Sequence, residues 1–475
     1  MLTLADMVEA LTGARPHRAL PVITEAVVDS RQVIPGALFI ALPGQRTDGH
    51  TFVEDAFSRG AACALVQRQP DGNHPVIDLR AGAAAVSFVN GLPLHEGPLC
   101  LLVEDCLQAM QRIARFWRRK LEVKVIGVTG SVGKSTTKEL VADVLSQRYT
   151  TLKNPGNLNN EIGLPLTLLS LSEGHQRAVL EMGFYLPGEI AFLCDLALPS
   201  IGVVTNIGTV HAERAGDQET IARGKAELLE ALPAEGVAIL NYDDPLVRQM
   251  AQKTRARVLF YGLDPAADLW ADEVEGLGLE GIRFRLHYAG EIVYLRVPLI
   301  GRHSVHTALR AAAVGLVDDL SWQEILGGMR TGTTHLRLMA VRTPQGALLL
   351  DDTYNASPES TLAALNLLEE LEGRKIAVLG DMLELGRYEQ SGHEMVGIRA
   401  SEVVDMLVSV GERGKMIATA AFQAGLPAAQ IVQLENIQQV TDLLRQRLLS
   451  GDVVLIKGSH GMRMDRIVTA LESQP

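Results

Sequence analysis

Short apolar runs separated by turn residues fill the first hundred positions of the chain. Thr3, followed by Asp6 three residues later, predicts the start of a helix, and Gly13 predicts its end. Apolar runs of strand length come next, separated by glycine and proline. They cover residues 26–29, 37–42, 62–66 and 76–79. Residues 92–98 are typical of a linker, and residues 103–121 of an amphipathic helix.

From residue 123 onward, runs with the period of a strand alternate with runs that have the period of a helix. Residues 123–129 are almost continuously apolar, as in a strand covered on both faces of a parallel sheet. Residues 282–288 alternate, and Ala289-Gly290 predicts a hairpin turn into residues 292–297. Further strands are predicted at 178–182, 201–206, 237–240, 258–261, 348–352, 376–380, 406–410 and 453–457, and helices at 137–145, 217–232 and 304–317. This alternation predicts an α/β protein with parallel sheets.

Composition narrows the class of protein. Hydrophobic residues make up 47% and charged residues 21%, the balance of a globular chain with ample core. A net charge of −12 disfavours non-specific binding to nucleic acid or to an anionic membrane. No apolar run approaches the roughly 18 residues of a membrane helix, and the N-terminus carries acids where a signal peptide carries bases. The four cysteines lack metal-binding spacing, so we expect a cytoplasmic protein without nucleic-acid or membrane partners.

A glycine-rich loop between a predicted strand and a predicted helix is the sharpest local motif. Glycines let a backbone fold around phosphate oxygens, and the helix that follows offers unpaired N–H groups. Lys134 is expected to reach the β- and γ-phosphates of a nucleotide, and the Ser135 hydroxyl to ligate Mg²⁺. The strict Gly-x4-Gly-Lys-Ser/Thr pattern is not met, because Val128 stands at its first glycine, and a glycine-rich turn with an exposed lysine is the alternative. The candidate nucleotide-binding residues are Gly130, Ser131, Val132, Gly133, Lys134, Ser135 and Thr136.

Three further polar residues are candidates for the site. Glu181 closes one predicted strand and His211 follows another, and ligand sites in open α/β sheets lie at the carboxyl ends of strands. A solvated glutamate and an ordinary loop histidine are the alternatives. Lys225 lies on the apolar stripe of its helix between Ile221 and Leu228, so its ammonium either snorkels to the edge or is partly buried with a lowered pKa. A neutral lysine amine can take up CO₂ and become a carbamate, which ligates metal as a carboxylate does.

Taken in order along nearly the whole chain, these motifs resemble the Mur ligase family of ATP-dependent amide-bond-forming enzymes in peptidoglycan synthesis. Residues 29–44 and 48–50 are similar to the family's UDP-sugar domain, and residues 127–137 to its ATP loop. Residues 154–165 are similar to a stretch typical of the dipeptide-adding member. Similar C-terminal motifs cover residues 351–358, 380–386 and 457–459.

The resemblance implies a fold of three α/β domains. These are a small N-terminal UDP-sugar-binding domain over residues 1–98, a central P-loop parallel-sheet ATP-binding domain over residues 99–332, and a C-terminal Rossmann-like domain over residues 333–475. A length of 475 residues, at roughly 150 residues per domain, agrees with this division.

The resemblance also implies roles for individual residues. Lys134, Glu181, His211 and Lys225 are the implied catalytic group. Ser135 and Glu181 would hold one Mg²⁺, whereas His211 and Lys225 as a carbamate would serve another. Further nucleotide contacts are implied for Asn241, Asp244 and Arg337. Substrate contacts are implied for Ser30, Arg31, Gly44, Asp48, His50, Asn157, Asn159, Asn160, Asp352, Tyr354, Asn355, Asp381 and Glu384.

The implied reaction joins D-alanyl-D-alanine to UDP-N-acetylmuramoyl-tripeptide through an acyl phosphate, with ATP and Mg²⁺, in a protein that we expect to be a monomer. The alternatives are a ligase that adds a single amino acid, as folylpolyglutamate synthases do, and a nucleotide-binding scaffold without chemistry. Two departures from the family pattern bear on ATP binding. Ser304 and Thr307 replace both asparagines of a Gly-x-His-Asn-x-x-Asn motif, and His335 stands in a hinge where proline and glycine are common.

Overall fold

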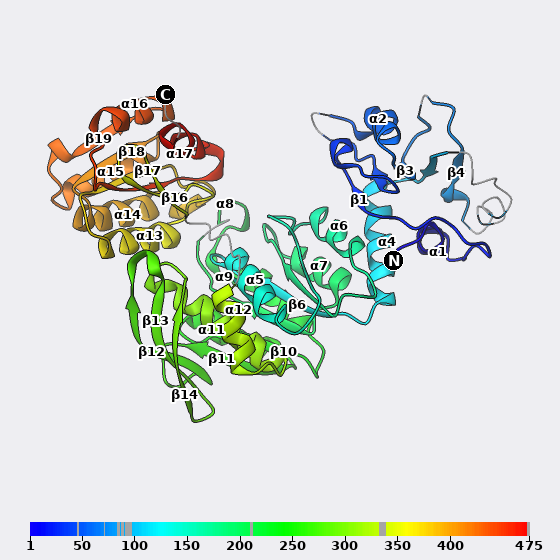
Figure 1. The fold of residues 1–475 in the computed structure, drawn as a ribbon, viewed down its shortest axis with the longest axis horizontal. Coiled ribbons are helices and arrows are strands. Elements are labelled where there is room, and N and C mark those ends of the chain that lie inside the picture. Colours follow the sequence, from blue (N-terminus) through cyan, green and yellow to red (C-terminus); the bar gives the residue numbers. More distant parts are fainter. Residues whose placement is uncertain are drawn as a thin grey trace. The chain divides into compact units, whose positions relative to one another are not determined.

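The described residues contain three sheets, which lie in the N-terminal, the central and the C-terminal stretch of the chain. The structure is a computed structural model that describes residues 1–44, 47–70, 72–82, 86, 90, 97–209, 212–331 and 339–472 (Figure 1). Its sheets have five, nine and six strands, so the three-domain α/β fold is confirmed. By internal packing the chain divides into two compact units: residues 1–127, 149–183 and 189–200 form the first, and residues 128–148, 184–188 and 201–475 the second. The domain boundaries at residues 98 and 332 stay predictions.

The first sheet lies in the first unit and is parallel throughout, with the strand order β1-β2-β3-β5-β4. Its strands are β1 (Ala26–Val27), β2 (Leu38–Ile40), β3 (Cys63–Val66), β4 (Val76–Asp78) and β5 (Leu99–Leu102). The predicted first helix is α1 (Leu4–Thr12), where Thr3 and Asp6 form a capping box and Gly13 closes the helix with a φ of 77°. The apolar pattern missed β5, which directly follows the expected linker. Most of that linker lies outside the described residues.

In the described part of the first unit, the other α-helices are α2 (Val53–Ser58), α4 (Cys106–Lys120), α6 (Gly163–Leu169) and α7 (Glu189–Ala197). Helix α4 is the predicted amphipathic segment, and Asp105 caps its start by accepting from the Gln108 N–H.

The nine-stranded sheet has the order β14-β13-β12-β11-β10-β9-β6-β8-β7. Strands β9 to β12 pair in parallel, whereas β12, β13 and β14 pair antiparallel. Its strands are β6 (Lys124–Thr129), β7 (Thr151–Lys153), β8 (Arg177–Glu181), β9 (Ile201–Val204), β10 (Val237–Asn241), β11 (Arg257–Gly262), β12 (Leu269–Gly276), β13 (Ile282–Tyr288) and β14 (Glu291–Val297). The predicted hairpin turn is confirmed, because Tyr288 pairs with Glu291 across Ala289 and Gly290, whose φ angles are 49° and 84°.

Where the structure describes the second unit, six α-helices accompany this sheet. They are α5 (Lys134–Leu145), α8 (Ala212–Ala215), α9 (Gln218–Glu230), α10 (Pro245–Gln249), α11 (Val305–Val317) and α12 (Trp322–Thr331). The predicted start of α5 at Thr137 is wrong by three residues. Gly133 takes a left-handed φ of 84° as the residue before the helix, so Lys134 and Ser135 already belong to its first turn.

The third sheet has the order β15-β16-β20-β17-β18-β19 and is parallel except for β15. Its strands are β15 (Met339–Arg342), β16 (Leu348–Asp352), β17 (Lys375–Gly380), β18 (Met406–Val410), β19 (Ile431–Leu434) and β20 (Val453–Lys457). The helices are α13 (Pro358–Glu370), α14 (Glu389–Val403), α15 (Gly414–Gln423), α16 (Ile437–Arg447) and α17 (Asp465–Glu472). Helices α13 to α15 pack on one face and α16 with α17 on the other (Figure 1), as in a doubly wound fold.

Within the described ranges, no helix is both long enough and apolar enough to cross a membrane.

Candidate functional site

The phosphate loop between β6 and α5 is fixed by the segment that follows β9. The Asn206 side chain bonds Val132 twice, accepting from its N–H at 2.9 Å and donating to its carbonyl at 3.0 Å. The Thr205 hydroxyl also donates to the Val132 carbonyl, and the Ser131 hydroxyl accepts from the Gly208 N–H at 2.8 Å. The loop is therefore held in one curvature by side chains outside it.

Gly130 is a position that only glycine can occupy in this loop. Its φ is 142°, and a Cβ atom there would lie 1.8 Å from the Thr205 hydroxyl oxygen. Because glycine has no side chain, the backbone of the loop can pass directly against the end of β9.

Lys134 lies against its own loop. Its ammonium donates to the carbonyl oxygens of Gly130 at 2.8 Å and Ser131 at 3.0 Å. The side chain is half-buried, so the exposed lysine of the alternative interpretation is not what the structure shows. Ser135 and Thr136 follow in the first turn of α5, where helix N–H groups are available to an anion.

Lys225, on α9, is completely buried. Its ammonium nitrogen donates to the Gly130 carbonyl at 3.0 Å and lies 4.8 Å from the centre of the Phe184 ring. Burial, with the charge of Lys134 as a second cause, lowers the pKa of Lys225 well below its ordinary value. The snorkelling alternative therefore does not hold, and the fold makes this amine easier to deprotonate than an exposed lysine.

Two predicted residues fall outside the described part of the chain. His211 and Arg337 belong to the segments at residues 210–211 and 332–338, and the structure does not test their roles. The helix directly after His211 is α8, and the N–H of Glu213 in it donates to the carbonyl of Glu384, a residue predicted to contact substrate, at 3.2 Å.

Glu181 belongs to the first unit and is buried at the end of β8. Its carboxylate accepts from the Asn159 side chain at 2.8 Å. The Asn154 side chain, also buried, joins the backbone of Glu181 through bonds of 2.9 and 3.2 Å. The solvated glutamate of the alternative interpretation is therefore excluded. The predicted asparagine-rich segment therefore positions this carboxylate through Asn154 and Asn159. Asn160 accepts from the Gly163 N–H at 2.9 Å at the start of α6, and Asn157 is exposed.

Asn241 and Asp244, the predicted adenine-side contacts, make structural bonds at the end of β10. The Asn241 side chain donates to the Thr205 carbonyl at 3.1 Å, and the Asp244 carboxylate accepts from the Ile207 N–H at 2.8 Å while capping α10. Both residues thus order the segment that supports the phosphate loop, and a contact with adenine stays a prediction.

The substrate residues predicted near the N-terminus form ion pairs within the first unit. Arg31 pairs with Asp29 at 2.6 Å and is 80% exposed, with Ser30 buried beside it. Asp48 bonds His50 at 2.6 Å, and the other ring nitrogen of His50 accepts from the Gln67 N–H. Gly44 closes the neighbouring turn by donating to the Thr47 carbonyl. The exposed guanidinium of Arg31 is the group in this set that is open to a ligand.

The predicted residues of the C-terminal part separate into buried and exposed groups. Asp352 accepts from the buried Lys457 ammonium at 2.6 Å, and the Asn355 carbonyl accepts from the same nitrogen at 2.9 Å. Asp381 is buried and accepts from two N–H groups at the start of α15. Tyr354 is 39% exposed. The structure thus gives Asp352 and Asp381 supporting roles in the fold and leaves Tyr354 accessible.

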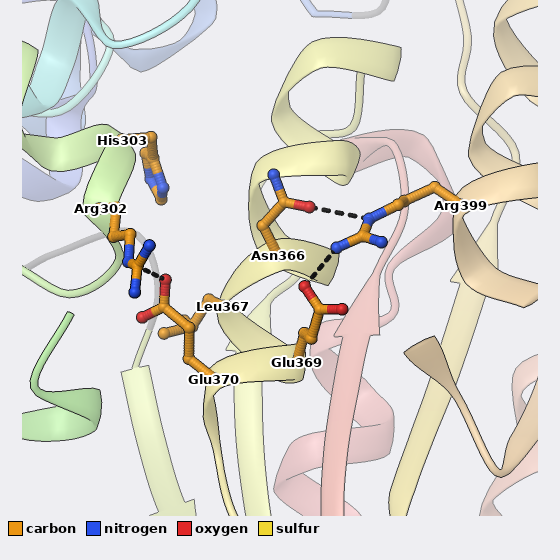
Figure 2. A pocket seen from close by; sticks show the side chains of 7 residues that line it. All are labelled: Arg302, His303, Asn366, Leu367, Glu369, Glu370 and Arg399. Atoms are coloured by element: carbon orange, nitrogen blue, oxygen red, sulfur yellow. Dashed lines mark hydrogen bonds and ion pairs between the residues drawn. The ribbon is translucent and has the colours of Figure 1, made fainter. Parts of the chain in front are cut away.

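A polar cavity of about 360 Å³ lies in the second unit, and the described residues that line it include none of the predicted site residues. Figure 2 shows Arg302 directed toward Glu370 and Arg399 toward Asn366 and Glu369. Opposite charges already face each other there, so the cavity offers no single charge to a ligand.

Sequence reasoning missed several residues that shape the phosphate loop. Thr205, Asn206, Tyr261 and Arg310 support it from three different elements. Thr205 and Asn206 end a predicted strand, but no local signal indicates that any of the four supports the loop, because the loop is distant from them in the sequence.

The donor chemistry of two predicted residues suits a magnesium ion. Ser135, in the second unit, and Glu181, in the first, each carry a hard oxygen donor of the kind that Mg²⁺ prefers. Among the described residues, no cluster of three His, Cys, Asp or Glu side chains could hold a metal alone. Mg²⁺ commonly uses only one or two carboxylates together with water and substrate phosphates, so such a cluster is not required.

Comparison with known proteins gives matches along the whole chain. Three family profiles match: "Mur ligase family, catalytic domain" over residues 22–118, "Mur ligase middle domain" over residues 128–315, and "Mur ligase, glutamate ligase domain" over residues 336–460. The UDP-N-acetylmuramoyl-tripeptide--D-alanyl-D-alanine ligase of Bacillus subtilis is 35% identical over 479 residues, which cover 99% of this chain and 98% of the relative.

Solved structures agree with this match. The crystal structure of MurF from Acinetobacter baumannii has 28% identity and a TM-score of 0.83, covering 99% of this chain and 98% of the other. The structure of MurF ligase from Thermotoga maritima in complex with ADP has 26% identity and a TM-score of 0.78, covering 98% of each chain.

Proposed function

The chain belongs to the Mur ligase family, and on this premise we propose that it is an ATP-dependent ligase that joins D-alanyl-D-alanine to UDP-N-acetylmuramoyl-tripeptide. The observation that carries the proposal is the match to the Bacillus subtilis ligase of that name, 35% identical along 99% of this chain. The single-amino-acid ligase is not favoured, because the full-length relative carries the dipeptide-adding name.

The reaction proceeds in two steps. A carboxylate oxygen of the tripeptide attacks the γ-phosphorus of ATP, ADP leaves, and an acyl phosphate remains. The amine of D-alanyl-D-alanine then attacks the acyl carbon, inorganic phosphate leaves, and the nitrogen loses a proton as the amide forms. The first step gathers negative charge around the γ-phosphate, so positioned cations are its main requirement.

Lys134 supplies one such cation. Its ammonium already lies on the loop carbonyls of Gly130 and Ser131, and the positive end of the α5 helix dipole adds to the attraction for phosphate oxygens. Burial lowers the pKa of the neighbouring Lys225, and the neutral amine is the form of lysine that takes up CO₂. As a carbamate it would present oxygen atoms beside the loop.

By the family resemblance, Ser135 and Glu181 are the proposed ligands of one Mg²⁺, and His211 and carbamylated Lys225 are those of a second. When bound, Mg²⁺ neutralises phosphate charge and so favours transfer to a carboxylate. Asn159 and Asn154 hold Glu181 in place, so that its carboxylate keeps one orientation.

Release of phosphate from ATP is the direct test. Wild-type protein is given ATP and Mg²⁺ with UDP-N-acetylmuramoyl-tripeptide and D-alanyl-D-alanine, each alone and both together. We expect release that requires both acceptors, and a pentapeptide product of the corresponding mass.

Two other results would contradict the proposal. Release that accepts single amino acids but not the dipeptide would favour the single-amino-acid ligase. Binding of ATP with slow hydrolysis that no acceptor changes would favour the scaffold.

A further inference from the structure

Arg310, on α11, carries a buried positive charge beside the phosphate loop. The residue is 3% exposed. Its guanidinium donates to three hydroxyl oxygens: Thr137 at 2.8 Å, Tyr261 at 3.1 Å and Thr307 at 2.7 Å. Across the described residues it has no carboxylate partner. A buried arginine is normally paired with an acid, so this charge is without its usual compensation.

The guanidinium lies directly behind the point where the loop becomes a helix. A Cβ atom on Gly133 would lie 3.2 Å from one of its terminal nitrogens, and Gly133 immediately precedes Lys134. Thr137, which accepts from Arg310, donates its own hydroxyl to the Gly133 carbonyl at 2.6 Å. Arg310 therefore bears on the loop through both Gly133 and Thr137.

The two other acceptors connect the guanidinium to neighbouring elements. Tyr261, on β11, donates its hydroxyl to the Thr205 carbonyl at 3.1 Å, and Thr205 itself bonds the loop at Val132. Thr307 is one of the positions where this chain departs from the asparagine of its family. The guanidinium thus ties α11, β11 and the first turn of α5 into one network.

We propose that Arg310 is a positioning residue for the phosphate chain of ATP, a role that rests on the proposed use of ATP by this protein. It holds Gly133 and Thr137 so that the loop keeps its phosphate-binding curvature before the nucleotide arrives. Its uncompensated charge also adds to the positive potential of the loop, which the phosphates of ATP neutralise on binding.

If Arg310 positions the loop for ATP, its replacement should weaken nucleotide binding without lowering the stability of the fold. When Arg310 is replaced by methionine, Thr137 and Tyr261 keep their own carbonyl acceptors, and a buried charge without an acidic partner disappears. Replacing buried charges with apolar residues of similar volume is often neutral or stabilising. A residue with a purely structural role would instead be needed for stability.

The test compares Arg310→Met with wild type, and uses Arg445→Met, an exposed arginine on α16, as the matched control. The Kd for ADP and the KM for ATP should rise roughly ten- to a hundredfold in Arg310→Met. The KM values for the two other substrates and the unfolding midpoint without nucleotide should not change. Arg310→Lys, which keeps the charge but loses the planar fork, should fall between these variants.

Several results would overturn the inference about Arg310. Wild-type affinity for ADP in Arg310→Met would overturn the inference, and so would a lowered midpoint with equal losses for all three substrates. If Arg310→Met does not fold, Thr307→Val and Tyr261→Phe each remove one acceptor, and unchanged ADP binding in both would overturn it. Failure of the wild-type protein to bind ADP would instead count against the proposed function.

Discussion

Lys134 and Lys225 share one hydrogen-bond acceptor, although 90 residues separate them in the sequence: the Gly130 carbonyl accepts from Lys134 at 2.8 Å and from Lys225 at 3.0 Å. Complete burial, with the repulsion between the two ammonium groups as a second cause, lowers the pKa of Lys225 well below its ordinary value. The two lysines on this carbonyl therefore differ in how readily they lose a proton, and Lys225 loses it more easily than an exposed lysine does.

Replacing Lys134 should stop the reaction. Lys134→Ala removes the loop ammonium that is placed for the γ-phosphate, and we expect kcat to fall about a thousandfold or more. The measurement is phosphate release with both acceptors present. Binding of UDP-N-acetylmuramoyl-tripeptide serves as the control and should not change. Turnover near the wild-type rate would remove the phosphate loop from the mechanism.

Replacing Lys225 should also stop the reaction, but small carboxylic acids should restore part of the activity. Lys225→Ala leaves a cavity where the carbamate would lie, so formate or acetate should restore part of the activity. Lys134→Ala is the matched control and should gain nothing from these acids. In wild type, ¹³C-labelled CO₂ should give a carbamate signal that Lys225→Ala lacks. The absence of that signal in the wild-type protein would refute the carbamate.

Lys225 should also make stability depend on pH. The unfolded chain keeps this amine protonated until the pH nears the ordinary lysine value of about 10.4, whereas the folded chain loses the proton earlier. The unfolded state binds more protons, so this residue makes stability rise with pH, by at most about 1.4 kcal/mol per pH unit. Urea unfolding in CO₂-free buffer at pH 7 to 9.5 should show Lys225→Met more stable than wild type, with a difference that shrinks as the pH rises. A constant difference would mean that the amine is charged in the fold.

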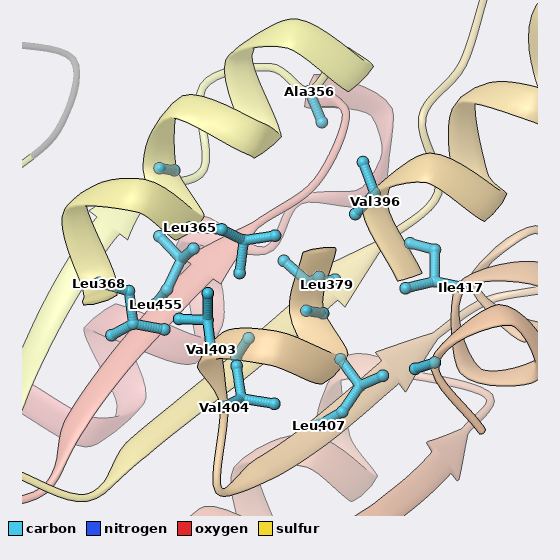
Figure 3. Packing of buried hydrophobic residues seen from close by; sticks show 14 of the residues in the cluster. Ala356, Leu365, Leu368, Leu379, Val396, Val403, Val404, Leu407, Ile417 and Leu455 are labelled. Atoms are coloured by element: carbon cyan, nitrogen blue, oxygen red, sulfur yellow. The ribbon is translucent and has the colours of Figure 1, made fainter. Parts of the chain in front are cut away.

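Local patterns predicted the elements better than the contacts between them. The boundaries of α1 were predictable because Thr3, Asp6 and Gly13 act within one helix. The start of α5 was not, because Gly133 takes its left-handed backbone in the context of the folded loop. The C-terminal core shows the same limit: Figure 3 places Leu365, Leu407 and Leu455 in one cluster. Each was predictably apolar, but nothing local indicates that they meet.

In the candidate site too, local sequence pattern predicted the positions of residues but not their contacts. The apolar stripe of α9 placed Lys225 on the buried face, but its acceptor, Gly130, lies 95 residues earlier. Glu181 was identified by its position at the end of a strand, yet its burial depends on Asn159, 22 residues earlier. Arg310 gave no signal at all, because its three acceptors come from three separate elements.

The bond between Asn159 and Glu181 should control the affinity for metal. Asn159→Ala removes the donor at 2.8 Å, so the buried carboxylate loses its fixed orientation. Losses of such supporting groups typically weaken metal binding about ten- to a hundredfold. The Mg²⁺ concentration at half-maximal phosphate release should rise accordingly. Asn73→Ala, at an exposed asparagine of the same unit, is the control. An unchanged Mg²⁺ requirement in Asn159→Ala would separate Glu181 from the metal.

The ion pair between Asp352 and Lys457 allows a structural role to be separated from a substrate-binding one. Asp352→Asn leaves a buried ammonium without its charge partner, and we expect the free energy of unfolding to fall by about 3 kcal/mol. The double variant Asp352→Asn with Lys457→Met removes both charges and should recover most of that stability in urea unfolding. If Asp352 also binds the dipeptide, as the resemblance implies, the KM for D-alanyl-D-alanine stays raised in the double variant while its stability returns. Recovery of stability and KM together would mean that Asp352 serves the fold alone, and Tyr354, exposed beside it, would be the next candidate for the dipeptide contact.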